Sequence, residues 1–339
     1  MTGRLRATVI GLGVGEQHAR AYLADPRVEL ASVFDIDPPR RQRVAADLGV
    51  PEAESFEAAI DGADVVSIAS YDADHAGEVL ACLSAGKHVF VEKPLCRTSD
   101  ELAAIGRAWR ATGVKLSSNL ILRRAPLYED LRRRIADGEL GEIYAFDGDY
   151  LFGRLEKILQ GWRGREAGYS ALHGGGVHLV DLLLWLVGQR PTKISGHGGK
   201  VVTRGAAFAG DDLVSVSMST EEGLIARVST HLGCVHRHQH VVRIFGTEGT
   251  FIYDDAGARL HRTRDPAQPS EPLPTPPLPA NKGDLIPGFI DAIVEDRDLT
   301  DHTHAMFDVV SICSAGVRAI ATGEQIEIEY WRSDEAVRT

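Results

Sequence analysis

The stretch Ala7-Thr8-Val9-Ile10-Gly11-Leu12-Gly13-Val14-Gly15 decides the fold of this chain. Its first four residues predict a short buried strand, and the glycines that follow predict a tight turn into a helix. Bare backbone at such a turn lets a pyrophosphate approach the amide groups of the helix N-terminus. A glycine-rich turn alone is weak evidence for a nucleotide site, so the surrounding sequence has to support it.

Strand and helix patterns alternate around this turn, from Leu5 to Ser118. Short apolar runs predict strands at residues 7–10, 30–34, 64–68, 88–91 and 114–116. Amphipathic stretches predict helices at residues 40–48, 75–83 and 100–111. Such alternation is typical of βαβ units around a parallel sheet that is covered on both faces.

The pattern changes after about Asn119. Helices are expected at residues 126–136 and 177–186, and strands at 213–219, 224–230, 240–245 and 250–253. Seven prolines between Pro266 and Pro279 predict an extended surface loop, because proline cannot donate ladder hydrogen bonds. Helices at 285–295 and 304–321 and a strand at 325–330 follow. We therefore expect a doubly wound α/β domain at 1–119 and an α+β domain with a large, mostly antiparallel open sheet at 120–339.

Length and composition fit two globular domains. The chain has 339 residues, of which 44% are hydrophobic and 25% charged, enough to bury two cores. Its net charge of -11 argues against nucleic acid or an anionic membrane as a partner. We see no signal-peptide pattern and expect no segment apolar enough to span a bilayer, so a cytoplasmic protein is expected. The four cysteines lack paired or metal-type spacing, which argues against a disulfide framework or a zinc site.

An acidic residue at the end of the second expected strand supports a nucleotide site. Asp35 follows the glycine turn by about 20 residues, where a carboxylate accepts hydrogen bonds from the adenosine ribose. It would repel a 2′-phosphate, and Ile36 offers no cation to hold one, so NAD is favoured over NADP. A simpler alternative is that Asp35 only caps the turn with Asp37. The expected cofactor contacts at the glycine turn are Gly11, Gly13, Val14 and Gly15.

A lysine follows the fourth expected strand. Glu92-Lys93-Pro94 places Lys93 at the carboxyl end of a sheet strand, where open α/β sheets bind their ligands. Lysine there can hydrogen-bond a substrate hydroxyl, and a lowered pKa would let it transfer a proton. Pro94 would fix the approach of this lysine, for example through a cis bond. Taken by itself, the tripeptide is explained as well by a surface Lys–Glu pair.

A second candidate for proton transfer follows a run of glycines. His173-Gly174-Gly175-Gly176-Val177-His178 leads into an expected helix with Asp181 in its first turn. Three glycines let the chain run close to a ligand, and His178 titrates near neutrality. A lone histidine is more often structural, but the adjoining glycines and the upstream lysine favour a functional role.

The sequence resembles the Gfo/Idh/MocA family, the group of glucose-fructose oxidoreductase and inositol dehydrogenase. The resemblance covers nearly the whole chain. It rests on the glycine turn with His18 shortly after it, the run from Ala85 to Leu95, the glycine run ending in His178, and Gly246-Thr247-Glu248-Gly249-Thr250. It implies an NAD(P)-binding Rossmann domain, a second domain for substrate binding and oligomerisation, and hydride transfer between a sugar or cyclitol carbon and nicotinamide.

The resemblance also implies roles for single residues. Lys93 corresponds to the catalytic lysine and His178 to the acid–base histidine. Further contacts to NAD are expected at Ser70, Asp72, His75, Glu92 and Lys93, and contacts to substrate at Asn119, Arg123, His178 and Asp181. Lys93 or His178 would accept the proton of a secondary alcohol while hydride passes from the same carbon to nicotinamide, and the reverse reaction is equally open.

Three positions depart from the family pattern. The glycine turn is one residue shorter than usual, with Gly15 in place of a later third glycine. The usual Thr-Pro-Asn reads Ser70-Tyr71-Asp72. The aspartate that commonly precedes the histidine by four positions is Gly174, which leaves the Lys-Asp-His set incomplete. His173 or Asp181 would compensate, or His178 would act with Lys93 alone.

Trp162, Arg163 and Tyr169, with Arg154 and Arg165 nearby, form a second group of interest. Their rings would stack on a sugar, and the guanidinium groups would hold a phosphate or carboxylate, which points to a phosphorylated or nucleotide-linked sugar. Solvated loop charge explains the arginines equally well.

His236, His238 and His240 alternate, which on a strand would place them on one face. A pocket wall or a subunit interface is preferred to a metal site for them, since no carboxylate accompanies them at a recognisable spacing. The open sheet of the second domain needs a cover for its apolar face, so a homodimer or homotetramer is expected.

Three functions are consistent with the sequence. The leading one is an NAD-dependent dehydrogenase for a sugar or cyclitol. A glycosidase that recycles tightly bound NAD fits the same architecture, as does a nucleotide-sensing regulator without catalysis. Net release of NADH separates the first from the second, and the presence of Lys93 and His178 argues against the third.

Overall fold

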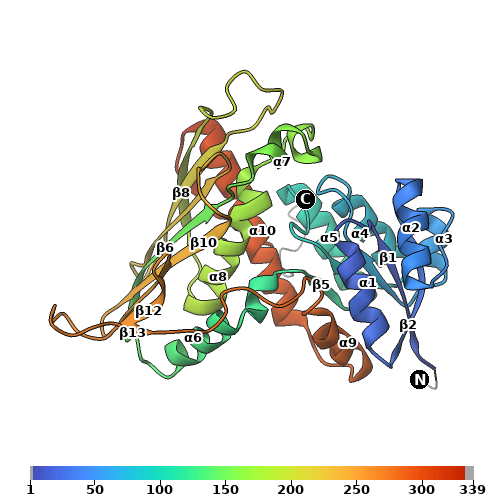
Figure 1. Ribbon diagram of the computed structural model, residues 1–339, viewed down its shortest axis with the longest axis horizontal. Coiled ribbons are helices and arrows are strands. Elements are labelled where there is room, and N and C mark those ends of the chain that lie inside the picture. The colour runs from blue at the N-terminus through green and yellow to red at the C-terminus, as the bar shows by residue number, and fades with distance from the viewer. Residues whose placement is uncertain (1–2, 333–339) are drawn as a thin grey trace. The chain divides into compact units, whose positions relative to one another are not determined.

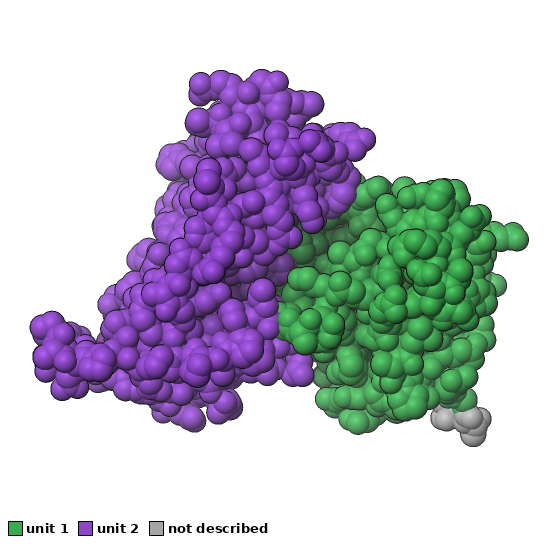
Figure 2. Space-filling view, viewed as in Figure 1, with its two compact units in different colours: residues 1–121, 279–307, 331–339 green, residues 122–278, 308–330 purple. Residues whose placement is uncertain are grey.

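The computed structural model describes residues 3–332, which divide into two compact units (Figure 2). Within the described residues, unit 1 comprises 3–121, 279–307 and 331–332, and unit 2 comprises 122–278 and 308–330. The first division lies close to the expected boundary at 119/120. Unit 1 also takes up the segment 279–307, which the prediction assigned to the second domain.

Unit 1 is built on a parallel sheet with the strand order β2-β1-β3-β4-β5 (Figure 1). Its strands are β1 (Leu5–Ile10), β2 (Val28–Phe34), β3 (Val65–Ile68), β4 (His88–Val91) and β5 (Leu116–Ser118). Its helices are α1 (Gly15–Ala24), α2 (Pro38–Leu48), α3 (Phe56–Asp61), α4 (His75–Ser84), α5 (Ser99–Thr112) and α9 (Ile286–Val294). The order reverses between β1 and β3, which is the point where doubly wound sheets bind nucleotides. The predicted doubly wound sheet is confirmed.

Local sequence signals set the ends of α5 in unit 1. Thr98 and Glu101 form a reciprocal capping box at its start, with the Glu101 N–H donating to Thr98 Oγ1 over 3.1 Å. Gly113 ends the helix at a φ of 66°, which glycine adopts without strain.

The core of unit 1 explains why residues 279–307 belong to it. Ile286, Phe289 and Ile290 of α9 are buried in the same apolar cluster as β1 and β2. Phe289 lies 5.6 Å from Phe90 of β4, measured between ring centroids. Helix α9 therefore completes the Rossmann core, although its sequence lies far from the other elements.

Unit 2 contains a nine-stranded sheet with the order β13-β12-β11-β10-β6-β9-β8-β7-β14. Its strands are β6 (Ile143–Leu151), β7 (Lys193–Gly199), β8 (Leu213–Ser219), β9 (Ile225–His231), β10 (Gln239–Gly246), β11 (Thr250–Asp254), β12 (Gly257–His261), β13 (Glu271–Pro272) and β14 (Ile326–Glu327). β6 and β9 are parallel, and the other pairings are antiparallel. The predicted mostly antiparallel sheet is confirmed.

Helices lie on one face of this sheet. α6 (Pro126–Ala136) packs on α8 (Val177–Val187), and α8 packs on β6 and β9 (Figure 1). The shorter elements are η1 (Ile121–Arg124), α7 (Leu155–Leu159), η2 (Trp162–Gly164) and the π-helical turn η3 (Leu172–Gly176), which leads into α8. In the described part of unit 2, no helix covers the opposite face, which we call the open face.

Several details differ from the sequence expectations. β14 covers only Ile326–Glu327 of the strand expected at 325–330. The proline-rich loop includes the two-residue strand β13. Pro272 of β13 lies opposite Arg259 of β12, at the edge of the sheet.

The last long helix corrects the expectation on membrane spans. α10 (Thr300–Thr322) is long and apolar enough to cross a membrane by length and composition, with a mean hydropathy of 1.4 over 18 residues. However, 67% of that window is buried within the protein, as in the core helix of a soluble protein.

Candidate active site

The glycine turn between β1 and α1 presents open backbone in unit 1. Gly11 has a φ of 79°, and a Cβ there would overlap the backbone of Ala69, so only glycine fits. A Cβ at Gly13 would meet no atom within 4 Å. Val14 precedes the ten-residue helix α1, whose first amide groups lack partners within the helix. This open space at a helix N-terminus fits a pyrophosphate.

Asp35 directly follows β2 and binds the backbone of the glycine turn. Its carboxylate accepts hydrogen bonds from the backbone N–H of Leu12 (2.7 Å) and of Asp37 (2.8 Å). Arg40 forms an ion pair with it at 3.2 Å. Arg40 Nη1 also lies 3.5 Å from the other Asp35 oxygen, so ribose hydroxyls would compete with Arg40 for this carboxylate. The structure thus shows the capping role, and ribose binding by Asp35 stays a prediction.

Ser70, Asp72 and His75 follow the carboxyl end of β3. The Ser70 hydroxyl donates to Glu78 Oε2 over 2.5 Å, and Asp72 is buried. His75 is fully buried and its Nδ1 lies 2.6 Å from the carbonyl oxygen of Pro94. Of the three, Ser70 adjoins the glycine turn, since a Cβ at Gly11 would lie 2.5 Å from the Ser70 backbone nitrogen. His75 thereby contacts the Lys93–Pro94 segment, whose peptide bond is cis.

Glu78 is expected to make the protein less stable as pH rises. Burial raises its pKa to about 7, helped by Asp74 and opposed by the hydrogen bond from Ser70, whereas the ordinary value is 4.5. Between these two values the folded protein retains a proton that the unfolded chain has lost, so the free energy of unfolding falls with rising pH.

In Glu78→Gln the melting temperature, measured by calorimetry, should depend less on pH between about pH 5 and 7. Glu57→Gln, an exposed position in α3, is the control and should keep the wild-type slope. An unchanged slope in Glu78→Gln would show that Glu78 does not cause the pH dependence.

Glu92 anchors the segment that carries Lys93. His18, which is fully buried, bridges Ser67 (Nδ1 to Oγ, 2.9 Å) and Glu92 (Nε2 to Oε1, 3.2 Å). Asn119 donates to the same Glu92 oxygen over 2.6 Å, and the Lys93 N–H lies 3.2 Å from the other. Burial would raise the pKa of Glu92, but His18, Lys93 and Asn119 lower it to about 2, so the group is a carboxylate at neutral pH. The backbone of Lys93 is therefore held in place directly after β4.

Asn119 supports this network from the end of β5. Its side chain is buried, and its amide also donates to the carbonyl oxygen of Lys282 over 2.8 Å. The structure thus assigns Asn119 a contact with the Glu92 segment, and a direct contact with substrate stays a prediction.

In unit 2, His178 lies in the first turn of α8 among other aromatic groups. The imidazole is buried and its ring lies 5.5 Å from that of His240, nearly perpendicular to it. His240 contacts His238 and Tyr150, each at 5.2 Å between ring centroids. His178 is thus bounded on one side by the amino-terminal end of β10.

Arg123 and Asp181 pair with each other in unit 2. Arg123 Nε lies 3.0 Å and Nη2 2.5 Å from Asp181 Oδ1, and Asp181 is 1% exposed. Burial raises the pKa of Asp181, and Arg123 acts against it. The pair orients η1 and α8, and a direct contact of either residue with substrate stays a prediction.

Trp162 and Tyr169 are brought together as expected. Their rings lie 6.2 Å apart at 88°, and the Arg163 guanidinium lies 4.3 Å above the Trp162 ring. Arg154 lies over Phe152 at 5.4 Å. Trp162 and Arg163 are half-buried and Tyr169 is buried. The aromatic cluster exists, and its contact with a sugar stays a prediction.

Two of the three alternating histidines lie together, since the rings of His238 and His240 are 5.2 Å apart and both contact Tyr150, whereas the expectation is corrected for His236. His240 lies in β10, whereas His236 lies before the strand and contacts Asp255 at 2.9 Å. Among residues 3–332, no group of three or more His, Cys, Asp and Glu side chains is arranged to hold a metal ion.

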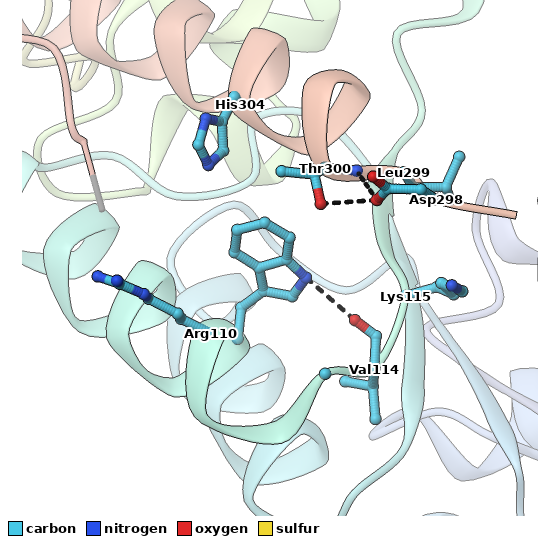
Figure 3. Close-up of a pocket in the computed structure, with 9 residues that line it drawn as sticks. Arg110, Val114, Lys115, Asp298, Leu299, Thr300 and His304 are labelled. Atoms are coloured by element: carbon cyan, nitrogen blue, oxygen red, sulfur yellow. Dashed lines mark hydrogen bonds between the residues drawn. The ribbon is translucent and has the colours of Figure 1, made fainter. Parts of the chain in front are cut away.

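A cavity of about 280 Å³ lies elsewhere on unit 1, lined by Trp109, Lys115 and residues 298–300 among others (Figure 3). It sits at the amino end of β5, whereas the residues above follow the carboxyl ends of strands. Several of its polar groups are already paired: Trp109 Nε1 donates to Val114, Lys115 pairs with Asp296, and Thr300 donates to Asp298. This cavity is therefore separate from the candidate site.

Sequence reasoning missed the partners that hold the site. Arg40 beside Asp35, Glu78 beside Ser70, and the links of His18 to Ser67 and Glu92 connect residues far apart in the chain. No local motif marks them, apart from the position of His18 after the glycine turn.

Comparison with known proteins agrees with this geometry. Residues 5–120 match the model of an oxidoreductase family with an NAD-binding Rossmann fold, and residues 128–252 match the GFO/IDH/MocA C-terminal domain. Inositol 2-dehydrogenase of Acidothermus cellulolyticus is 30% identical over 258 residues, covering 73% of this chain and 72% of the relative. scyllo-Inositol 2-dehydrogenase (NAD(+)) of Bacillus subtilis is 28% identical over 264 residues, covering 74% of each. The predicted NAD-binding domain is confirmed.

Solved structures show the same fold. A levoglucosan dehydrogenase in complex with NADH and L-sorbose superposes with a TM-score of 0.85 at 22% identity, covering 96% of this chain and 99% of that one. Both units therefore have the fold that the sequence predicts.

Proposed function

Because this chain belongs to the GFO/IDH/MocA family of NAD-binding oxidoreductases, we propose that it oxidises a secondary alcohol of a sugar or cyclitol and passes the hydride to NAD. The observation that carries the proposal is the position of Lys93. It follows β4 at the carboxyl edge of the sheet and is fixed through Glu92 and its partners.

The residues present fit the cofactor. Open backbone at Gly13 and the N-terminus of α1 would hold the pyrophosphate, and the Asp35 carboxylate would accept from the ribose hydroxyls in place of Arg40. When bound, NAD supplies a hydride acceptor at its nicotinamide. Lys93 or His178 then takes the hydroxyl proton of the substrate, so that a carbonyl forms and the proton passes on to solvent.

The names of the relatives suggest the substrate class. They include dehydrogenases of inositol, of scyllo-inositol and of levoglucosan, which are uncharged polyols or anhydrosugars. We propose such an uncharged substrate first. A phosphorylated or nucleotide-linked sugar is the second candidate, supported by Arg154 and Arg163 beside the aromatic rings of unit 2.

The experiment is formation of NADH at 340 nm with NAD and a panel of inositols, anhydrosugars, free sugars, sugar phosphates and nucleotide sugars. A substrate-dependent rise with the uncharged members supports the proposal, and a rise only with phosphorylated members supports the second candidate. If no member of the panel gives NADH although NAD is shown to bind, the dehydrogenase activity is contradicted. The cofactor-recycling glycosidase or the regulator would then be favoured.

We also propose that the protein is a cytosolic homo-oligomer that assembles through the open face of unit 2. That face carries the ion pairs of Asp147 and Asp149 with Arg227 and Arg243, beside the half-exposed side chain of Ile225. Light scattering should give a dimer or tetramer, and Ile225→Glu should shift it toward the monomer. A monomeric wild-type protein would contradict assembly.

A further inference from the structure

The glycine run before α8 is filled by the protein's own side chains. Gly174, Gly175 and Gly176 lie in the π-helical turn η3, and none of them has a positive φ. Helical backbone does not demand glycine and is less stable with it than with alanine. A steric reason for the glycines is therefore needed.

Two tyrosines supply that reason. A Cβ at Gly174 would overlap the Tyr169 hydroxyl and lie 2.7 Å from Tyr169 Cζ. A Cβ at Gly175 would overlap the ring of Tyr150, with Cζ at 2.8 Å. The volume at Gly174 that another residue would fill with a side chain thus holds a phenol hydroxyl. The expectation that the glycines leave room for a ligand is corrected at these two positions.

The position of this hydroxyl is fixed by packing. Tyr169 is buried, and its ring packs edge-on against Trp162 at 6.2 Å and against Phe208 at 6.1 Å. Rotation of the ring away from Gly174 would break both contacts. A tyrosine held in this way offers a hydroxyl that both donates and accepts hydrogen bonds.

His178 lies four residues after Gly174. Side chains four residues apart lie about one turn from each other on the same side of a helix. The π-helical turn η3 that carries Gly174 is a distortion that often marks functional sites. The Tyr169 hydroxyl therefore lies about one turn ahead of the His178 imidazole, at the place where a longer residue at 174 would carry its own polar group.

We propose that Tyr169 is a positioning residue for His178, whose hydroxyl orients the imidazole for proton transfer in place of a side chain at Gly174. This inference rests on the proposed function, since it assigns His178 the substrate proton. The proton moves from the substrate hydroxyl to the imidazole, and the phenol keeps its own. His240 of β10 faces this imidazole at 5.5 Å between ring centroids, and Tyr150 lies 5.2 Å from His240 in turn.

The test combines titration with kinetics in the full-length protein. The pKa of the His178 imidazole is measured by NMR, with the signal assigned from His178→Asn. In Tyr169→Phe we expect this pKa to move by about half a unit or more. We expect kcat to fall roughly tenfold or more, with little change in KM or in NAD affinity. Tyr128→Phe, a buried phenol in α6, is the control and should leave both readouts unchanged.

A rescue experiment separates positioning from packing. Tyr169→Ala vacates the volume at Gly174, so Tyr169→Ala/Gly174→Asp should recover kcat relative to Tyr169→Ala, whereas Gly174→Asp alone should be impaired by overlap with Tyr169. An unchanged His178 pKa in Tyr169→Phe would overturn the inference whether or not the enzyme turns over. An absence of NADH formation by the wild-type protein would instead count against the proposed function.

Discussion

Lys93→Ala is expected to lower kcat for NADH formation by roughly 10²–10⁴-fold, the range that general acid–base groups contribute. The physical reason is loss of the ammonium group, which would donate a hydrogen bond to the substrate oxygen and make its hydroxyl proton easier to remove. The backbone at this position is held through Glu92, His18 and Asn119, so the change should leave the fold intact.

The measurement is steady-state kinetics with the best substrate from the panel, together with NAD affinity by fluorescence. Lys87→Ala is a matched control in the same unit, since Lys87 precedes β4 and donates to the carbonyl of Asp61 at 3.2 Å. It should retain wild-type kcat. If Lys93→Ala turned over at the wild-type rate, the assigned proton chemistry would be wrong.

Asp35→Asn is expected to shift the cofactor preference toward NADP by about 100-fold or more, because a like charge beside a phosphate costs several kcal/mol. The carboxylate of Asp35 lies beside Arg40, at 3.2 Å. Without its negative charge, Arg40 becomes available to a 2′-phosphate, as arginines are in NADP-binding members of this fold. Asparagine keeps one oxygen to accept from the Leu12 N–H, so the glycine turn should retain its shape.

The readout is the ratio of dissociation constants for NADPH and NADH, measured by fluorescence without substrate. Asp37→Asn is the control, because Asp37 also contacts Arg40, at 3.4 Å, but lies two residues further from the end of β2. It should keep the preference for NADH. An unchanged ratio in Asp35→Asn would remove Asp35 from the cofactor site.

Much of unit 1 could be predicted from the sequence, because its signals are local. A strand buried on both faces reads as a continuous apolar run, as at Val65–Ile68 and His88–Val91. Helix α6 matched its expected range of 126–136, since its first turn contains proline and its apolar positions repeat at helical spacing.

The central strand of unit 2 could not be predicted in the same way. β6 contains Asp147, Gly148 and Asp149, residue types that are rare in strands. The negative charges of the two aspartates are neutralised from neighbouring strands. Arg227 of β9 and Arg243 of β10 form ion pairs with both carboxylates. Burial would raise the pKa of Asp149, but hydrogen bonds from His231 and Arg227 lower it below its ordinary value. Only the assembled sheet shows why acidic residues are tolerated there.

In the candidate site, too, local motifs could be found from the sequence and distant contacts could not. Motifs located Lys93, Asp35 and the glycine turn, because each follows directly from its place after a strand. The partners of these residues come from distant segments, as with His18, Ser67 and Glu92. The glycine run shows the limit most clearly, since its sequence suggests space for a ligand and the fold fills that space with Tyr169 and Tyr150.

Isotope tracing follows hydride transfer from the carbinol carbon to NAD. The protein is incubated with NAD and carbon-deuterated myo-inositol, scyllo-inositol or levoglucosan, and the products are analysed by mass spectrometry and NMR. Hydride transfer would place deuterium at C4 of the nicotinamide of NADH, together with an equal amount of the ketone. Absence of labelled NADH from all three, with NAD bound, or cleavage of the sugar with NAD returned to its oxidised form, would contradict it.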